Sequence, residues 1–223
     1  MELWDLYDAE RKPLGRTHVR GEEFAEGEYY VCCEIWVINS EGKFLTTKRH
    51  PDKKAGNQWE FVGGGTFAGE TTLQSAVREL QEETGIKAEE QDLKFLSTYA
   101  HNNYFMDIYV LKSDVEIGSI VLQPEEAIDV KWATGDEIQA MIDAGEFVRS
   151  VGGRYGQYKE DALKKAEEII VTKYGIGTAV GMCLGVGVGL AVGISWDNVG
   201  MGLAIGAALG MCFGVALDAR KRK

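Results

Sequence analysis

The stretch 64-GGTFAGETTLQSAVRELQEETGI-86 decides the fold of this chain. It begins in a glycine cluster, Gly63–Gly65, directly after an apolar segment, and it becomes helical in character from about Thr71 to Thr84. Gly85 follows as a helix-ending residue. An α-helix turns once per about 3.6 residues, so positions three and four apart share a face. The stretch therefore predicts a strand, a glycine-rich loop and an amphipathic helix in succession.

The predicted helix carries acidic residues on one face and apolar residues on the other. Arg78 precedes Glu82 by four positions, and the acidic face holds Glu79, Glu82 and Glu83. The opposite face can pack on a core through Leu73, Ala76, Val77 and Leu80. Like charges at this spacing destabilise a helix by about 0.2–0.5 kcal/mol per pair. The acidic face is thus either solvated surface, partly compensated by Arg78, or a site for a hard cation such as Mg2+, Mn2+ or Ca2+.

The complete pattern separates these two interpretations. Read in order, it is Gly64, five residues, Glu70, seven residues, Arg78-Glu79-Leu80, one residue, Glu82-Glu83, one residue and Gly85-Ile86. This order is similar to the signature of the Nudix hydrolases, G-x5-E-x7-R-E-U-x-E-E-x-G-U with U a bulky aliphatic residue, and every fixed position is filled. The resemblance covers about residues 1–150 and favours the cation site.

The Nudix resemblance implies a fold, a cofactor and a reaction. The fold is an α/β/α sandwich around a mixed sheet, and the reaction is attack of water on a diphosphate in a nucleoside diphosphate linked to another group. The cofactor is usually Mg2+, with Mn2+ as an alternative. The implied metal ligands are the carboxylates of Glu79, Glu82 and Glu83 and the backbone carbonyl of Gly64, while Glu70 and Arg78 would orient the helix and its carboxylates. Diphosphate cleavage builds charge on oxygens, which metal ions neutralise while they position water.

Further candidate residues lie outside the motif. Residues 4–22, WDLYDAERKPLGRTHVRGE, resemble the N-terminal extension of the isopentenyl-diphosphate-isomerase-like Nudix group, and Arg20 is a candidate contact for a substrate anion. Lys48 and Arg49 precede a loop and are candidate diphosphate contacts, although solvated surface is the commoner position for such cations. Glu125 and Glu126 match in place a glutamate that adds a metal ligand or general base in related hydrolases.

The order of the other predicted elements supports an α/β fold. Apolar alternation and β-branched or aromatic runs predict strands over 2–7, 14–19, 29–39, 43–49, 93–100, 104–111 and 128–132. Helices are predicted over 137–144, capped by Thr134 or Asp136, and over 157–172. Helices and strands mixed in this way indicate layers of helices on a sheet.

Composition narrows the functional classes. The chain has 223 residues with 35 acidic and 24 basic side chains, a net charge of -11, which disfavours a nucleic-acid partner. The cysteines Cys32, Cys33, Cys183 and Cys212 form neither a CxxC pair nor a disulfide framework. The N-terminus lacks the apolar segment of a signal peptide, so we expect a cytoplasmic catalytic domain.

The C-terminal tail departs from the Nudix pattern. Residues 174–196 and 198–217 carry no charge, and each run approaches the about 20 residues that cross a bilayer as a helix. Glycines recur every fourth residue in both runs: Gly177, Gly181, Gly185, Gly189 and Gly193, then Gly202, Gly206, Gly210 and Gly214. This pattern predicts a glycine-zipper helical hairpin with a turn at 195–198. We expect it to be attached to the inner face of a membrane, with both ends cytoplasmic, or to self-associate in water as a homo-oligomer through its glycine seams.

We therefore expect a Nudix hydrolase domain over 1–155, a helical linker over 156–174 and the hairpin over 175–223. The expected activity is Mg2+-dependent cleavage of a diphosphate linkage in a nucleoside diphosphate compound or a related organic pyrophosphate. One alternative is a module that binds nucleotide diphosphates with little turnover. Another is an isoprenoid-diphosphate isomerase, for which the N-terminal resemblance is the support and against which the intact hydrolase motif argues.

Overall fold

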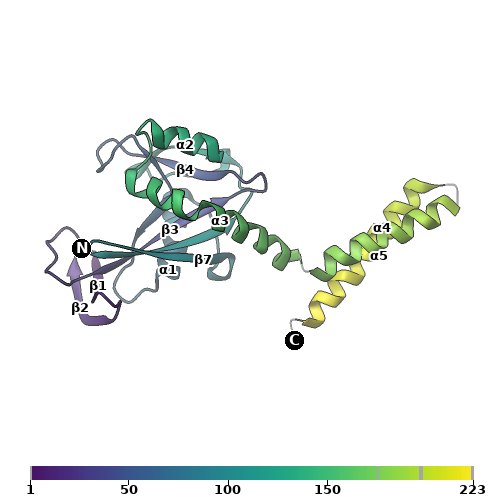
Figure 1. The fold of residues 1–223 in the computed structure, drawn as a ribbon, viewed down its shortest axis with the longest axis horizontal. Coiled ribbons are helices and arrows are strands. Elements are labelled where there is room, and N and C mark those ends of the chain that lie inside the picture. The colour runs from purple at the N-terminus through teal and green to yellow at the C-terminus, as the bar shows by residue number, and fades with distance from the viewer. Residues whose placement is uncertain (1, 175, 196–197, 222–223) are drawn as a thin grey trace. The chain divides into compact units, whose positions relative to one another are not determined.

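The computed structural model describes residues 2–174, 176–195 and 198–221 (Figure 1). The chain divides into two compact units, Met1–Ala166 and Glu167–Lys223. The first unit holds all the strands found in the described residues. The second consists of helical segments only, within the part of it that is described.

The strands and helices of the first unit follow the predicted order closely. The strands are β1 (Leu3–Tyr7), β2 (Pro13–Val19), β3 (Tyr30–Ile38), β4 (Phe44–Arg49), β5 (Trp59–Glu60), β6 (Val62–Gly65), β7 (Leu93–His101), β8 (Tyr104–Lys112) and β9 (Ala127–Ala133). The helices are α1 (Thr72–Thr84), α2 (Gly135–Asp143) and the first part of α3 (Arg149–Tyr174), with short 3-10 turns η1 (Glu90–Asp92) and η2 (Ile117–Ser119). The predicted α/β class is confirmed.

The main sheet has seven strands and is mixed. Its path runs β5-β4-β3-β8-β7, with β6 paired to β3 and β9 paired to β4. Strands β3 and β8 are parallel over their whole length, and the other pairs are antiparallel. Strand β4 pairs with β3 only at Ile38 and Phe44, because β6 occupies the same edge of β3.

The core lies on both faces of β3, whose side chains alternate between them. Cys33, Ile35 and Val37 belong to the cluster that also contains Ala76 and Leu80 of α1, as the helical pattern predicts. On the other face, Trp36 packs against Phe44, Phe61 and Tyr155 of α3, with ring centroids 4.9–6.0 Å apart. The sheet is therefore covered by α1 on one face and by α3 on the other, which is a sandwich of layers.

A separate two-stranded sheet, β1-β2, precedes the main sheet. A bridge from Tyr7 to Tyr29 joins it to the segment that leads into β3. Arg11, in the turn of this hairpin, donates to both carboxylate oxygens of Asp107 in β8, at 2.7 and 2.5 Å. The hairpin is thereby fixed against β8, an inner strand of the sheet, close to the start of α1, since Asp107 also accepts from Thr72 at 2.6 Å.

Helix α3 begins eight residues before the predicted start of the helix at 157, since it runs from Arg149. The region contains Gly152, Gly153 and Gly156, which individually weaken a helix by up to about 1 kcal/mol. Burial outweighs that cost, because Val151, Arg154 and Tyr155 are all 5% exposed or less. Tertiary packing therefore adds two turns that local sequence disfavours.

The second unit contains the end of α3 and then two helices, α4 (Ile176–Ser195) and α5 (Val199–Lys221), which pack along each other. An added Cβ at Gly185 would lie 2.1 Å from the carbonyl oxygen of Gly206, and one at Gly189 would lie 2.3 Å from that of Gly202. The two backbones thus approach as closely as glycine allows. The predicted turn includes residues 196–197, which lie outside the described part of the chain.

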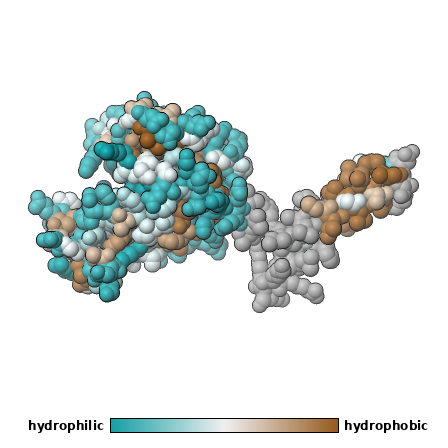
Figure 2. Space-filling model, viewed as in Figure 1, coloured by the Kyte–Doolittle hydropathy of each residue, from teal (hydrophilic) through white to brown (hydrophobic). Residues whose placement is uncertain are grey.

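The outward side of this pair is strongly apolar (Figure 2). The exposed large apolar residues are Leu184, Val186, Val188, Leu190, Val192, Ile194, Val199, Met201, Ile205 and Leu209. Nevertheless, within residues 2–174, 176–195 and 198–221, no helix is both long and apolar enough to cross a membrane. The predicted membrane attachment therefore gains no support from a membrane-crossing helix in the described part of the chain.

Candidate active site

Helix α1 is defined at both ends by its own sequence. Thr71 accepts a hydrogen bond from the backbone of Gln74 and donates its own backbone N–H to the Gln74 side chain, which is a capping box. Gly85 ends the helix with φ = 71°, a left-handed conformation that glycine adopts readily. Because these caps set the start and end of the helix, they also set the direction in which its carboxylates point.

Arg78 is the centre of the hydrogen-bonded network on this helix. Its Nη1 atom donates to Glu79 at 2.8 Å and to Glu82 at 3.1 Å, and its Nη2 donates to Glu70 and to the Gly65 carbonyl at 3.1 Å. The guanidinium also lies 3.8 Å from the centre of the Phe67 ring. Burial opposes ionisation of Arg78, but these carboxylates outweigh it and raise its pKa.

Glu70 connects the glycine loop to the helix. It accepts from the Phe67 backbone at 3.3 Å, from the Ser75 hydroxyl at 2.7 Å and from Arg78 Nε at 3.1 Å. Burial alone would raise the pKa of this carboxyl, whereas the hydrogen bonds from Arg78 and Ser75 outweigh burial and lower it. Glu70 is thus ionised and acts through Arg78, since it is absent from the lining of the adjoining cavity.

Gly64 brings the backbone of β6 against the acidic helix. It pairs with Cys33 of β3, and a Cβ added at Gly64 would lie 2.3 Å from Oε1 of Glu79. A side chain at this position would occupy the space that Glu79 fills. Glycine at this position therefore allows Glu79 to keep its present place against β6.

A cavity of about 220 Å³ gathers most of the predicted site, and we call it the carboxylate cavity. It is lined by Glu79, Glu82, Glu83, Arg78 and Gly63–Gly65, and also by Glu2, Arg20, Arg49, Lys53, Phe67, Gln123 and Glu126. Of the candidates outside the motif, Arg20, Arg49 and Glu126 are therefore brought to it. Lys48 instead lies 5.8 Å from the Trp59 ring, and Glu125 is exposed and outside the lining.

The carboxylates of this cavity differ in exposure and in proton affinity. The side chain of Glu82 is 52% exposed, whereas that of Glu79 is 13% exposed. Burial, together with the nearby charges of Glu79 and Glu60, raises the pKa of Glu83 to about 8. Burial also raises the pKa of Glu79 against the opposing effect of Arg78. A cation at this place would relieve both the mutual repulsion and the lost hydration.

The donor set fits a hard divalent cation in chemistry but not in its present arrangement. Oxygen-only ligands suit Mg2+ or Mn2+. Among the described residues, however, no three acidic, cysteine or histidine side chains converge closely enough to hold a metal. Arg78 accounts for this, because its Nη1 holds oxygens of both Glu79 and Glu82. Metal binding through these groups therefore requires them to turn away from Arg78, which the exposure of Glu82 permits.

Every cation on the wall of the carboxylate cavity, apart from Arg78, has a carboxylate partner of its own. Arg20 pairs with Glu2 at 2.7 Å, Arg49 pairs with Glu60, and Lys53 pairs with Glu126. Burial lowers the pKa of Lys53, and the nearby Arg49 lowers it further. These pairs bring three positive groups to the same cavity as the acidic helix without leaving them as isolated charges.

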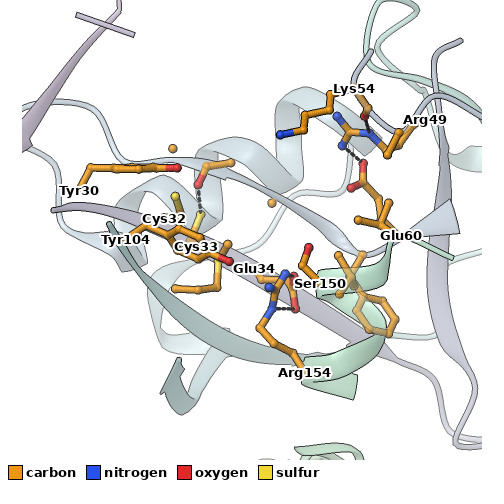
Figure 3. Close-up of a pocket in the computed structure, with 18 of the residues that line it drawn as sticks. Tyr30, Cys32, Cys33, Glu34, Arg49, Lys54, Glu60, Tyr104, Ser150 and Arg154 are labelled. Carbon is orange, nitrogen blue, oxygen red and sulfur yellow. Dashed lines mark hydrogen bonds and ion pairs between the residues drawn. The ribbon is translucent and has the colours of Figure 1, made fainter. Parts of the chain in front are cut away.

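A second cavity of about 380 Å³ adjoins the first, sharing Arg20, Arg49 and Gly63–Gly65 with it (Figure 3). Its other lining residues include Trp4, Tyr30, Cys32, Glu34, Lys54, Glu60, Tyr104, Ser150 and Arg154. We call it the distal cavity. Burial raises the pKa of the Cys32 thiol to about 12, so Cys32 is a neutral wall residue and not a nucleophile.

Sequence reasoning missed several residues of these two cavities. Lys53 and Glu60 stand in segments that carry no motif, and Arg154 lies in a stretch whose glycines hide its helix. Glu34 offered one signal, since it is a charge within the otherwise apolar run 29–39. A charged residue in a buried strand is rarely left unpaired, so a partner from elsewhere in the chain was to be expected.

The comparisons with known proteins agree with this geometry. The model of the NUDIX domain family matches residues 31–151. A Nudix hydrolase of Listeria monocytogenes is 35% identical over 150 residues, covering 66% of this chain and 89% of that protein. One of Clostridium acetobutylicum is 28% identical over 193 residues, covering 78% of this chain and 92% of that protein. An RNA pyrophosphohydrolase of Erythrobacter litoralis is 26% identical over 135 residues, covering 51% of this chain and 81% of that protein.

A crystal structure of DR0079 from Deinococcus radiodurans has the same fold, with a TM-score of 0.57 and 24% identity over 66% of this chain and 92% of that one. The comparisons give no support to the predicted resemblance of residues 4–22 to the isopentenyl-diphosphate-isomerase-like group. They also give none to a likeness between the tail and glycine-zipper proteins. The motif runs complete from Gly64 in β6 to Ile86 after α1, and its carboxylates Glu79, Glu82 and Glu83 line one cavity. The chain therefore belongs to the Nudix hydrolase family.

Proposed function

We propose that this protein is a Mg2+-dependent hydrolase of a diphosphate linkage in a nucleoside diphosphate compound or a related organic pyrophosphate. One observation carries the proposal: Glu79, Glu82 and Glu83 line a single cavity together with Arg20, Arg49 and Lys53. Nudix enzymes typically use a divalent metal ion, and the oxygen donors here suit Mg2+, with Mn2+ as the alternative. A cavity lined by both carboxylates and cations suits a metal-bound, negatively charged diphosphate.

In the proposed reaction, water attacks one phosphorus of the diphosphate, a new P–O bond forms, and the bridging P–O bond breaks. The bound ion would supply charge neutralisation and a more acidic water. Arg20, Arg49 and Lys53 would contact phosphate oxygens, while Arg78 and Glu70 hold the acidic helix in place. Glu126 is the candidate for the additional ligand or base, because it lines the cavity and Glu125 does not.

A substrate panel tests this proposal. Phosphate-containing products would be measured from nucleoside diphosphate sugars, dinucleoside polyphosphates and free nucleoside diphosphates, with Mg2+ and with excess chelator. We expect Mg2+-dependent release from at least one compound. The RNA pyrophosphohydrolases among the relatives suggest 5′-triphosphorylated RNA as a comparison substrate. We expect it to be a poor substrate, because the acidic composition of this chain disfavours binding of nucleic acid. Tight binding of a panel member without turnover would favour a sensing module instead.

Glu82→Gln is the matching variant. It removes a charged metal ligand at a half-exposed position while conserving shape, so we expect kcat to fall by about 100-fold or more with little change in Tm. Glu90→Gln, at an exposed position outside the carboxylate cavity, is the control and should behave as the wild type. Near-normal kcat of Glu82→Gln at saturating Mg2+ would contradict the metal assignment.

We infer further that residues 1–155 form the catalytic part, 156–174 a linker and 175–223 a glycine-zipper hairpin that self-associates in water. The spacing of glycines along both helices and the close backbone approach of α4 and α5 support the zipper. The apolar outward side supports self-association, because contiguous exposed apolar surface on a protein in water marks an interaction site. Light scattering tests this by comparing the molar mass of the full chain with that of a chain ending at residue 174. We expect the full chain to be an oligomer and the shortened chain a monomer, and monomeric masses for both would refute self-association.

A further inference from the structure

The distal cavity differs in charge from the carboxylate cavity that it adjoins. Its volume of about 380 Å³ is within the usual range for small-molecule sites, and none of the three motif carboxylates belongs to its described lining. In a chain with a net charge of -11, four cations and two carboxylates line it: Arg20, Arg49, Lys54, Arg154, Glu34 and Glu60. The inference below rests on the proposed function, because it concerns the part of the same substrate that extends beyond the diphosphate.

Lys54 is the cation of the two cavities whose charge is not offset within the described part of the chain. The two linings together hold six cations, and five of these pair with a carboxylate. The five pairs are Arg20 with Glu2, Arg49 with Glu60, Lys53 with Glu126, Arg78 with Glu70, and Arg154 with Glu34. No ion pair from Lys54 is found among the described residues, so its charge is open to a ligand in the distal cavity.

The backbone around Lys54 is held in a fixed and uncommon conformation. Arg49 donates from Nε to the carbonyl oxygen of Lys54 at 2.9 Å. The following residues Ala55 and Asn57 have φ values of 59° and 64°, which residues other than glycine rarely adopt. At Gly56, between them, an added Cβ would lie 2.2 Å from a backbone oxygen of the same loop. Strained backbone of this kind is concentrated at ligand-binding and catalytic sites.

The loop that carries Lys54 contributes to both cavities. Arg49 lines both of them, Lys53 lines the carboxylate cavity, and Lys54 lines the distal cavity. Figure 3 shows the side chain of Lys54 extending away from Arg49, toward the side on which Tyr30 lies. Two adjacent lysines therefore bring one ammonium group to the place of the diphosphate and another to the group that follows it.

The rest of the distal lining also suits an anion. It includes Ser150 and Val151 in the first turn of α3. The first N–H groups of a helix lack partners within the helix and carry partial positive charge, and the hydroxyl of Ser150 is a further donor. A phosphate monoester carries about 1.5–2 negative charges near pH 7 and three acceptor oxygens. It therefore gains more from Lys54 and these donors than a singly charged carboxylate does.

We propose that Lys54 determines substrate specificity by binding a phosphate group on the part of the substrate that lies beyond the diphosphate. The preferred substrate is then an organic diphosphate whose second moiety, a sugar or a nucleoside, is itself phosphorylated. Arg20 and Arg49, which both cavities share, contact the diphosphate, and Lys54 contacts the additional phosphate. A substrate with a neutral second moiety leaves the ammonium group of Lys54 in water and gains no affinity from it.

Binding of phosphate esters tests this without turnover, because the esters contain no diphosphate. Glucose 1-phosphate and glucose 1,6-bisphosphate form one matched pair, and adenosine 5′-monophosphate and adenosine 3′,5′-bisphosphate form a second. The members of each pair differ by one phosphate. Each compound would be titrated calorimetrically into the full chain with Mg2+ present. We expect the bisphosphate of at least one pair to bind about tenfold tighter or more, the effect of one charge-assisted hydrogen bond.

Three variants assign the preference to Lys54. Lys54→Gln removes the charge at an exposed position, where the chain should stay folded, and should reduce the preference to about threefold or less. Lys54→Arg keeps a cation that can bind phosphate and should retain most of the preference. Lys87→Gln removes the same charge at an exposed position outside both cavities, so it is the control and should match the wild type.

Several results would overturn the inference. These are equal affinities within both pairs, no binding of either bisphosphate by the wild-type chain, an unchanged preference in Lys54→Gln, or an equal loss of preference in Lys54→Gln and Lys87→Gln. Such results with Mg2+-dependent hydrolysis of some diphosphate still present would reject the phosphate site alone. Absence of all diphosphate turnover in the wild-type chain would instead reject the proposed function.

Discussion

At the residue scale, the absence of a side chain at Gly64 leaves room for the carboxylate of Glu79. Gly64→Ala adds a Cβ 2.3 Å from Glu79 Oε1, and because that contact is the end of a flexible side chain, Glu79 can turn away. We expect kcat to fall by about tenfold or more while Tm changes little. Gly153→Ala, at an exposed helical position with open space, is the matched control and should gain about 0.5–1 kcal/mol of stability without altering kcat.

Two adjacent glutamates provide the second prediction at this scale. Glu126 lines the carboxylate cavity beside Lys53, whereas Glu125 is exposed outside it. Glu126→Gln should lower kcat by about 10–100-fold, because it removes a charge that can bind metal or accept a proton. Glu125→Gln should leave kcat unchanged. Steady-state kinetics of both variants on one panel substrate tests this difference. Similar kcat values for the two variants would refute the role of Glu126 as a metal ligand or base.

At the element scale, the ionised carboxylate of Asp107 helps to hold the β1-β2 hairpin against the main sheet. Burial alone would raise the pKa of Asp107, but hydrogen bonds from Arg11, Thr72 and Thr98 outweigh it and lower the pKa. A carboxyl whose pKa is lower in the folded than in the unfolded chain stabilises the fold above its unfolded pKa of about 4. That stability is lost as the pH falls below about 4, through the folded value.

Asp107→Asn should therefore lower the free energy of unfolding at pH 7 by about 1–3 kcal/mol, since it weakens the bonds to Arg11. Below pH 4 the variant and the wild type should converge. Because the hairpin carries Trp4 and Arg20 of the cavities, KM should rise as well. Urea unfolding at several pH values tests this, with Asp129→Asn at an exposed strand position as the control. A pH-independent difference in stability would contradict it.

At the scale of the whole molecule, the two units should respond separately to substitution. Gly185→Ala places a Cβ 2.1 Å from the backbone oxygen of Gly206, which cannot move without separating α4 from α5. We expect hydrogen-exchange protection of both helices to fall, with kcat unchanged, because every residue of the carboxylate cavity lies in the first unit. Gly187→Ala on the same helix meets open space and should preserve protection. Equal exchange in the two variants would refute the close packing.

The features that depend on short-range spacing can be predicted from the order of the residues. The helix from Thr72 to Thr84, its glycine end and its acidic and apolar faces follow from residues three and four apart, and the strands follow from alternation. The motif on that helix was also readable because all its fixed positions lie within one continuous stretch.

Contacts between distant residues become visible in the folded chain alone. Glu34 and Arg154 are 120 positions apart, and Arg11 and Asp107 are 96 apart, so no local pattern couples them. The start of α3 at Arg149 depends on burial that outweighs the helix-weakening effect of three glycines. The course of the chain into β9 places Glu126 in the lining of the carboxylate cavity and Glu125 outside it. Helical and strand periodicity records which way a side chain faces, whereas a site depends on which other segment lies opposite, and that is fixed only when the sheet and its layers assemble.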